Sequence, residues 1–396
     1  MIYFDNSATT QVKTEVYEAM IPYLTTEYGN PSSKYYPLAV NAKNAVIKAR
    51  ESVAKLIGAN SEEIIFTSGA TESTNMIIKG ISDYKKYYEK TGNHIITSNV
   101  EHKATLNVCK FLNGDIYSNN DAVFSFAKTT NKIDRGFEVS FLDATKTGLI
   151  LPEVLKKEIK NTTVLASIIW GNNEIGTLND IKALGAVCHE DRGLFHTDAT
   201  QVVGKIPINV KDLNVDFMSF SAHKIYGPKG IGAAYIKSDE YGLPPFSAFI
   251  HGGEQEEGLR GGTLAVHNIV GFGKAAEIVL RDREITNKNL RKLDVEIIKI
   301  LTNIPNIQLI GDLKNRLPGI YSILIDKPDF NNERFLKKIS NEFSLSSGSA
   351  CTAGQPSHVL KAIGLSEYIN KVIRISISNN DNNIDINVIA DLLRGV

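Results

Sequence analysis

Residues 217–224 (FMSFSAHK) form a short apolar run that ends in hydroxyl groups, a histidine and Lys224, and residues 225–230 (IYGPKG) follow as a turn. A short apolar run bounded by a Gly/Pro turn predicts a buried strand. A lysine at the end of such a strand can be partly desolvated, which favours the neutral amine that forms a Schiff base. A surface lysine before a turn is the commoner alternative, but the polar neighbours of Lys224 favour a functional lysine.

Apolar runs of the same kind recur on both sides of this stretch. They alternate with helix-like segments, such as residues 39–57 and 180–190. This alternation predicts βαβ units and a mostly parallel sheet with both faces covered, in which ligands bind beyond the carboxyl ends of the strands. The other expected strands are residues 64–66, 94–96, 139–142, 164–169 and 194–196.

The pattern changes after about residue 265. A long, charged helical run covers residues 269–303, and two strand candidates follow at residues 320–325 and 372–377. We therefore expect a second, smaller α+β domain that is joined through a long helix. Residues 113–137 are polar and Asn-rich without clear periodicity, which indicates a surface insertion.

The composition is that of an ordinary globular protein. Of the 396 residues, 42% are hydrophobic and 22% are charged. Lys plus Arg and Asp plus Glu each total 44, so the formal net charge is zero. No charge excess argues for direct binding to nucleic acid or a membrane surface, and no run of about 20 apolar residues predicts a membrane span.

Three cysteines occur, at positions 109, 188 and 351. A sparse, odd number fits free thiols in a reducing compartment, and no two form a C-x-x-C metal pair. Because the first residues also lack the features of a signal peptide, we expect a cytoplasmic protein without a metal site.

The three cysteines have different surroundings. Cys109 and Cys188 lie in amphipathic helix patterns and are expected to be small buried side chains. Cys351 lies among small residues, in residues 346–356 (SSGSACTAGQP), which predict a mobile, accessible loop. An exposed thiol reaches the nucleophilic thiolate more easily than a buried one, so Cys351 is the candidate nucleophile.

An acid lies in residues 195–201 (FHTDATQ), just past another apolar run. Burying Asp198 is costly unless it meets a cation or a donor. A pyridinium nitrogen is such a partner, because enzymes that use pyridoxal phosphate keep this nitrogen protonated with an Asp. Taken alone, Asp198 is more often the N-cap of a helix.

Three further segments offer polar groups after a strand. Residues 67–73 (TSGATES) open a helix whose N-terminal N–H groups suit a phosphate, although a plain helix cap explains the same pattern. In residues 101–104 (EHKA), His102 can lie on an aromatic ring, whereas a lone histidine is more often structural. Residues 172–176 (NNEIG) offer amide donors.

In this order, the motifs resemble those of cysteine desulfurases of the NifS/IscS type, in the class V aminotransferase branch of pyridoxal-phosphate enzymes. Each motif alone is weak or moderate evidence, but so many in the family's order are very specific. Together they span nearly the whole chain, from residue 5 to about residue 376. The matching segments are residues 5–10 (DNSATT), 29–33 (GNPSS), 67–73, 101–104, 172–176, 198–201, 221–230 and 346–351.

The resemblance implies the type I fold of pyridoxal-phosphate-dependent transferases, with a mostly parallel seven-stranded sheet and a smaller α+β domain. We expect the large domain to cover residues 15–262. The small domain is expected to combine residues 1–14 and 263–396 and to carry the cysteine loop.

The resemblance also implies a role for each matching residue. Lys224 is the Schiff-base lysine, Asp198 pairs with the pyridine nitrogen, and His102 stacks on the ring. Arg374 binds the substrate carboxylate, with Asn173 beside it. The remaining roles are the ring oxygen for Asn173 and Gln201, the phosphate for Ala70, Thr71, Ser221 and His223, and the phosphate of the neighbouring subunit for Thr263.

The implied reaction removes sulfur from L-cysteine and leaves alanine, with Lys224 as the base and His102 as an acid or base. Cys351 receives the sulfur as a persulfide and passes it to an acceptor protein. The acceptor can belong to iron–sulfur cluster assembly, tRNA thiolation or DNA phosphorothioation. Thr263 implies a homodimer with shared active sites.

Several positions depart from the family pattern. Ala222 replaces a common glycine, and Glu254 and Glu257 stand where glycine and arginine are typical, which makes that rim more acidic. The loop after Cys351 and the C-terminal tail are shorter than usual, which leaves the acceptor open. A selenocysteine lyase, another class V aminotransferase and a non-enzymatic assembly subunit are the alternatives, although the last should lack the cofactor residues that are present here.

Overall fold

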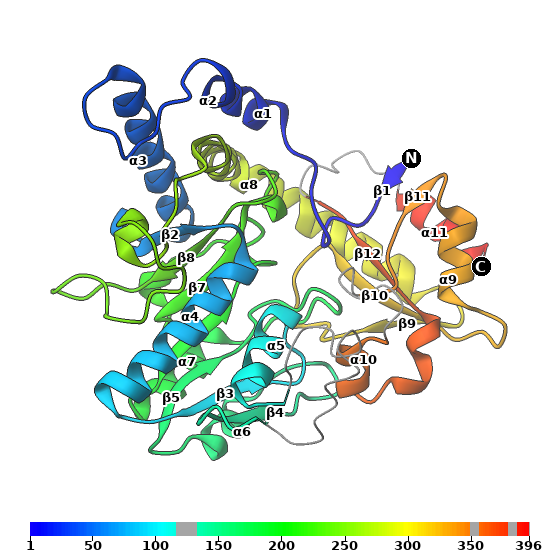
Figure 1. Cartoon of the computed structure of the whole chain (residues 1–396). Helices are drawn as coiled ribbons and strands as arrows, with labels where there is room; N and C mark the ends of the chain where they lie inside the picture. The colour runs from blue at the N-terminus through cyan, green and yellow to red at the C-terminus, as the bar shows by residue number, and fades with distance from the viewer. Residues whose placement is uncertain (116–132, 349–355, 379–385, 396) are drawn as a thin grey trace, which may run out of the picture.

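A seven-stranded sheet forms the centre of the larger part of the molecule (Figure 1). The computed structural model describes residues 1–115, 133–348, 356–378 and 386–395. The sheet has the order β2-β8-β7-β6-β5-β3-β4. Its strands are β2 (Ile64–Thr67), β3 (His94–Ser98), β4 (Glu138–Leu142), β5 (Thr163–Ser167), β6 (Leu194–Asp198), β7 (Phe217–Ser221) and β8 (Gly232–Ile236).

The expected sheet is confirmed, with one strand that the sequence pattern missed. Strand β8 runs antiparallel to both β2 and β7, whereas β7, β6, β5, β3 and β4 are joined by parallel pairings. Its sequence, GAAYI, has small residues where a strand usually shows bulky apolar ones. A Cβ atom added to Gly232 would lie 2.6 Å from the Cα of Gly69, so this position has to be a glycine to let the neighbouring turn approach.

Helices cover both faces of the sheet, as the continuous apolar strands require. Alternate residues of a strand enter different cores: Ala233 and Tyr235 pack with α3 (Pro37–Ile57), α7 (Ile181–Glu190) and α8 (Val266–Thr302), and Ala234 and Ile236 pack with α4 (Ala70–Tyr84) and α5 (Lys103–Leu112). The other helices of this part are α1 (Thr14–Met20), α2 (Pro22–Thr25) and α6 (Pro152–Glu158).

A second, antiparallel sheet forms the smaller part, in the order β12-β10-β9. Helix α8 connects the two parts, because its first half packs in the core of the large sheet and Leu290, Ile297 and Leu301 pack against the small one. The elements of this part are β9 (Ile307–Ile310), β10 (Ile320–Ile325), β11 (Phe343–Ser344), β12 (Val372–Ser376), α9 (Asn332–Ile339), α10 (His358–Ala362) and α11 (Ile386–Arg394).

The N-terminal segment belongs structurally to the smaller part. Strand β1 (Ile2–Tyr3) pairs in parallel with β11, and Phe4 is buried in the core of the small sheet. Among the described helices, none combines the length and apolar character that a membrane span requires. Short turns of 3-10 or π-helix lie at η1 (Ser61–Glu63), η2 (Lys85–Glu89), η4 (Val210–Asp212), η5 (Ala222–Lys224), η6 (Gln255–Gly258) and η7 (Ser366–Lys371).

Candidate active site

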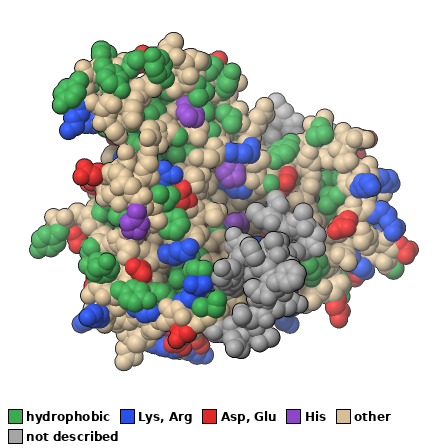
Figure 2. Space-filling view, in the orientation of Figure 1, with side chains coloured by type: hydrophobic (Ala, Val, Ile, Leu, Met, Phe, Trp, Pro, Cys, Tyr) green, Lys and Arg blue, Asp and Glu red, His purple; other side chains and the backbone are tan. Residues whose placement is uncertain are grey.

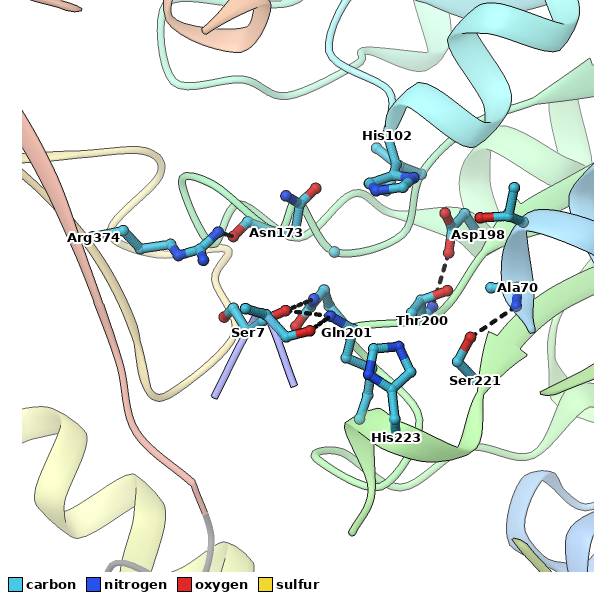
Figure 3. A pocket seen from close by; sticks show the side chains of 15 residues that line it. Ser7, Ala70, His102, Asn173, Asp198, Thr200, Gln201, Ser221, His223 and Arg374 are labelled. Carbon is cyan, nitrogen blue, oxygen red and sulfur yellow. Dashed lines mark hydrogen bonds between the residues drawn. The ribbon is translucent and has the colours of Figure 1, made fainter. Parts of the chain in front are cut away.

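A pocket opens at the carboxyl ends of the parallel strands, where the sequence predicts the ligand (Figure 3). It lies between the large sheet, the N-terminal segment around Ser7 and Ala8, and strand β12. Most of the predicted site residues line it together: Ala70, Thr71, His102, Asn173, Asp198, Gln201, Ser221, His223, Lys224 and Arg374.

Lys224 ends the 3-10 turn η5, directly after strand β7. Its Nζ donates hydrogen bonds to the backbone carbonyls of Ser7 and Ala8, the latter at 2.7 Å. Burial lowers the pKa of the adjacent His223 to about 4, and the charges of Lys224 and Lys229 act in the same direction. His223 is therefore neutral at neutral pH and can offer a hydrogen bond without adding a charge to the pocket.

Asp198 ends strand β6 and is only 4% exposed. Its Oδ1 accepts a hydrogen bond from the backbone N–H of Thr200 at 2.9 Å. The residues that follow form turns, so Asp198 is not the N-cap of an α-helix, which was the alternative reading of its sequence. A nearly buried carboxylate facing a pocket can stabilise a cationic group of a ligand.

The turn before helix α4 brings the N-terminus of this helix to the pocket. Ala70 begins the helix, and its N–H donates to the hydroxyl of Ser221 at 2.7 Å. The glycine at position 232, described above, lets this turn lie directly on strand β8. Helix N-termini carry unpaired N–H groups and a positive dipole, so this corner can hold a phosphate.

His102 has a structural contact that the sequence did not reveal. Its Nδ1 accepts a hydrogen bond from the backbone N–H of Ala104 at 3.1 Å, so His102 caps helix α5. In the neutral ring this contact leaves the proton on Nε2. The cap fixes the orientation of the ring at the pocket wall.

Glu101, which precedes the pocket residue His102, is a buried acid to which sequence reasoning gave no role. The carboxyl group is fully buried, and burial raises its pKa to about 8, although hydrogen bonds from Ser98 and Ile169 act in the opposite direction. Those two bonds reach Oε1, at 2.6 Å and 3.0 Å. The signal in the sequence was an acid three residues after a buried strand, which is costly if buried unless the acid is neutral or paired.

Arg374 closes the pocket from the small sheet. It is 1% exposed, and its guanidinium donates to Asp5 Oδ1 at 2.7 Å and to the backbone carbonyl of Asn173 at 2.9 Å. Its Nε is buried without a hydrogen-bond partner among the described residues. A buried arginine with a donor to spare can bind a substrate carboxylate.

Two predicted residues are not part of the described pocket. Thr263 is exposed and does not line the pocket of its own chain. Cys351 lies outside the described residues. On either side of its segment, however, a Cβ atom added to Gly348 would lie 3.3 Å from Glu174 Oε2, and the Ser357 hydroxyl donates to that same oxygen at 2.5 Å.

The segment before Thr263 contains the predicted acidic positions. Glu254 and Glu257 are exposed, as expected for an acidic rim. Glu256 between them is buried and forms an ion pair with Arg50, with contacts of 2.5 Å and 2.7 Å, which the sequence did not indicate. Arg260 Nε contacts Glu72 Oε1 at 2.9 Å, so this segment is also tied to the first turn of α4.

The other two cysteines are buried, as predicted. Cys109 and Cys188 are free thiols in the two cores of the large sheet. Burial raises the pKa of the Cys188 thiol to about 12, so it carries almost no thiolate at neutral pH. No group of three or more His, Cys, Asp or Glu within the described part of the chain is arranged to hold a metal ion.

Comparison with known proteins identifies the family. The model of the class V aminotransferase family matches residues 2–119 and 116–389. The cysteine desulfurase IscS of Ruthia magnifica subsp. Calyptogena magnifica is 41% identical over 397 residues, covering 99% of this chain and 91% of that protein.

Solved structures agree with this match. A NifS-like protein superposes with a TM-score of 0.85 at 33% identity, covering 100% of this chain and 98% of the other. SspA, solved in complex with cysteine, has a TM-score of 0.77 at 36% identity, covering 95% of this chain and 99% of its own. The chain therefore belongs to the class V aminotransferase family, alongside relatives that are cysteine desulfurases.

Proposed function

We propose that this protein is a cysteine desulfurase that uses pyridoxal 5'-phosphate to remove sulfur from L-cysteine, leaving L-alanine and a persulfide on Cys351. The observation that carries the proposal is the single pocket in which Lys224, Asp198 and Arg374 converge. The relatives named cysteine desulfurase IscS and the structural neighbour in complex with cysteine support the choice of substrate.

The residues of the pocket fit pyridoxal phosphate. Lys224 provides an amine, Asp198 a nearly buried carboxylate for a ring nitrogen, and the Ala70–Ser221 corner provides donors for a phosphate. When bound, this cofactor supplies an electron sink that weakens bonds at the α- and β-carbons of an amino acid. The pocket thus offers a complementary group for each polar part of the cofactor.

The substrate is held from the opposite side of the pocket. The Arg374 guanidinium binds the carboxylate of cysteine, using the buried Nε that has no described partner and exchanging one of its present contacts. Lys224 Nζ takes the Cα proton of the substrate. His102 Nε2, held towards the pocket by the cap at Nδ1, donates or accepts the proton that travels with the sulfur.

Cys351 is the sulfur acceptor. Its thiolate attacks the sulfur of cysteine, the Cβ–S bond breaks with its electron pair left on carbon, and protonation of that carbon yields alanine. Cys351 follows Gly348 by three residues, and a chain of that length spans at most about 11 Å. Because Gly348 lies beside Glu174, directly after the pocket residue Asn173, covalent geometry permits the thiol to reach the pocket.

A homodimer is part of the proposal. Large apolar side chains are exposed on α3 and the segment before it, including Tyr28 at 69% and Tyr35 at 95%. Figure 2 shows hydrophobic side chains gathered over this end of the molecule. Such a patch is typical of protein interfaces, and the exposed Thr263 can then reach the phosphate in the neighbouring subunit.

The proposal extends to a sulfur acceptor, a cellular compartment and a division into two domains. A sulfur-acceptor protein is needed because the persulfide must leave Cys351. Free, buried thiols at positions 109 and 188 support a reducing, cytoplasmic setting. We propose a large domain (residues 15–262) and a small one (residues 1–14 and 263–396); β1 and Phe4 pack with the small sheet, and the first half of α8 packs back into the core of the large one.

The test uses the purified protein with L-cysteine. We expect a yellow protein that forms alanine and carries one extra sulfur on Cys351 by mass spectrometry. Cys351→Ala should lose turnover, whereas Cys188→Ala, a matched thiol deletion outside the pocket, should retain it. Full turnover in Cys351→Ala would favour an aminotransferase or a selenocysteine lyase instead.

A further inference from the structure

Lys205 reaches the active site from behind the pocket. It lies in the turns that follow β6, four residues after Gln201, and its Nζ donates to Gln201 Oε1 at 3.0 Å. Lys205 does not line the main pocket but borders a small cavity behind it together with Lys224 and Asn6. Among the described residues, its side-chain hydrogen bond to a pocket residue is the one to Gln201.

The two contacts of Gln201 determine which way its amide points. Gln201 is 4% exposed, and its Nε2 donates to the backbone carbonyl of Ser7 at 2.9 Å. A carbonyl only accepts, so the amide nitrogen must face Ser7, and Lys205, which donates to the amide oxygen, reinforces the same orientation from the other side. One N–H of Nε2 is used by Ser7, which leaves the other for a ligand in the pocket.

The same network connects Lys205 with Lys224. The Ser7 carbonyl accepts from both Gln201 Nε2 and Lys224 Nζ. Burial lowers the pKa of Lys205 to about 7, and the charges of Lys224 and Arg374 act in the same direction. Keeping the Lys205 ammonium charged in these buried surroundings costs free energy that a solvent-exposed lysine would not incur.

We propose that Lys205 is a positioning residue that fixes the Gln201 amide with an N–H directed at a ring oxygen of the bound cofactor. The inference rests on the proposed function, because it assumes that pyridoxal phosphate occupies the pocket. Lys205 touches neither cofactor nor substrate and acts only through Gln201.

The experiment measures cofactor affinity rather than turnover. Apoprotein is titrated with pyridoxal 5'-phosphate and followed by its visible absorption, for the parent and for Lys205→Met, Gln201→Leu and the double variant. We expect Lys205→Met to weaken binding by about tenfold, the scale of one hydrogen bond in which a charged group takes part. In the Gln201→Leu background, Lys205→Met should change the affinity by less than about twofold, because the residue through which Lys205 acts is gone.

Two further variants control for general effects. Lys205→Arg keeps a side chain that only donates and should retain most of the affinity. Lys182→Met removes an exposed lysine from α7 and should change nothing. Should Lys205→Met not fold, Lys205→Gln replaces it: its side chain is uncharged and one atom shorter, so the bond to Gln201 Oε1 is weakened or lost and a loss of affinity is expected again.

The outcomes separate the two claims. A folded Lys205→Met protein with unchanged affinity, or losses that multiply in the double variant, would overturn the positioning role. A parent protein that takes up no pyridoxal phosphate would instead overturn the proposed function itself.

Discussion

The two sides of the pocket are built in different ways. One side, which we call the sheet wall, consists of His102, Asp198 and Lys224, each placed at the end of a strand of the large sheet or a few residues after it. The other side, the terminal wall, consists of the segment Ser7–Ala8 and of Arg374, which are separated by most of the chain. Hydrogen bonds join the terminal wall, because Ser7 N donates to Ser376 Oγ at 2.8 Å and Arg374 donates to Asp5.

This difference suggests a division of work. The sheet wall is supported by parallel strands that are buried on both faces, so its groups are preorganised for one rigid ligand. The terminal wall meets it through contacts that a ligand can replace, such as the bonds of Lys224 to Ser7 and Ala8. We therefore expect changes in the sheet wall to affect cofactor chemistry and changes in the terminal wall to affect the recognition of cysteine and the delivery of Cys351.

The largest effect should come from Lys224 in the sheet wall. Lys224→Ala removes the amine that holds the cofactor and takes the Cα proton, so turnover should fall by at least about a thousandfold. The visible absorption of the covalently held cofactor should disappear, while circular dichroism should remain that of the parent. If a folded Lys224→Ala protein kept its turnover, the sheet wall would not carry the cofactor chemistry.

Arg374 tests the terminal wall. Arg374→Lys keeps the charge but loses the planar fork, so the KM for cysteine should rise by about tenfold to a hundredfold. The cofactor absorption should stay unchanged, because the sheet wall is intact. Steady-state kinetics distinguish this result from a fall in kcat at constant KM, which would place Arg374 in the chemistry rather than in binding.

Glu101 beneath the sheet wall should make stability depend on pH. Its folded pKa is about 8, against 4.5 for an ordinary glutamate, so between these values the folded protein holds a proton that the unfolded chain releases. Its stabilising contribution is complete below pH 4.5 and is lost as the pH rises through 8, by an amount on the order of a few kcal/mol.

The corresponding variant is Glu101→Gln, which stays neutral at every pH. Thermal unfolding should show it close to the parent at pH 5 and more stable than the parent at pH 8.5. Glu254→Gln, at an exposed position, is the control and should follow the parent at both values. Parallel curves for Glu101→Gln and the parent would mean that Glu101 is charged in the folded protein.

The smallest effect is expected at Ser357, which bonds Glu174 beside the pocket. Ser357 donates to Glu174 Oε2 and caps α10 by accepting from the N–H of Leu360 at 3.1 Å. Ser357→Ala should cost about 1 kcal/mol of stability and slow persulfide formation a few-fold without changing the cofactor absorption. Ser340→Ala, at an exposed serine whose hydroxyl donates to the Lys337 carbonyl at the end of α9, should leave both quantities unchanged.

The sheet wall could be predicted from the sequence because its signals are local. A buried strand needs a short apolar run, and the polar residue that follows it lies at the same sheet edge as its counterparts, as Asp198 and Lys224 do. Strand β8 was missed because it begins with three small residues, and the glycine among them, Gly232, is required by the close approach of Gly69 in another segment.

Contacts between residues far apart in the chain could not be predicted from the sequence pattern. The sequence showed a lysine at position 205 and an acid after a strand at 101, but it could not decide that the lysine bonds Gln201 or that burial raises the pKa of the acid. Both properties depend on the distance to groups in other elements, and a pKa shift exists only once folding has removed the solvent.

The sequence alone thus determined the strand–helix order, the mostly parallel sheet and the identity of the groups at its carboxyl edge, because apolar periodicity and strand ends are properties of short segments. Only the tertiary structure decided that Asp5 and Arg374 share one ion pair, that Ser7 bridges Gln201 and Lys224, and that Glu174 contacts Ser357. These contacts join residues far apart in the chain, and their geometry arises only when the two sheets pack together.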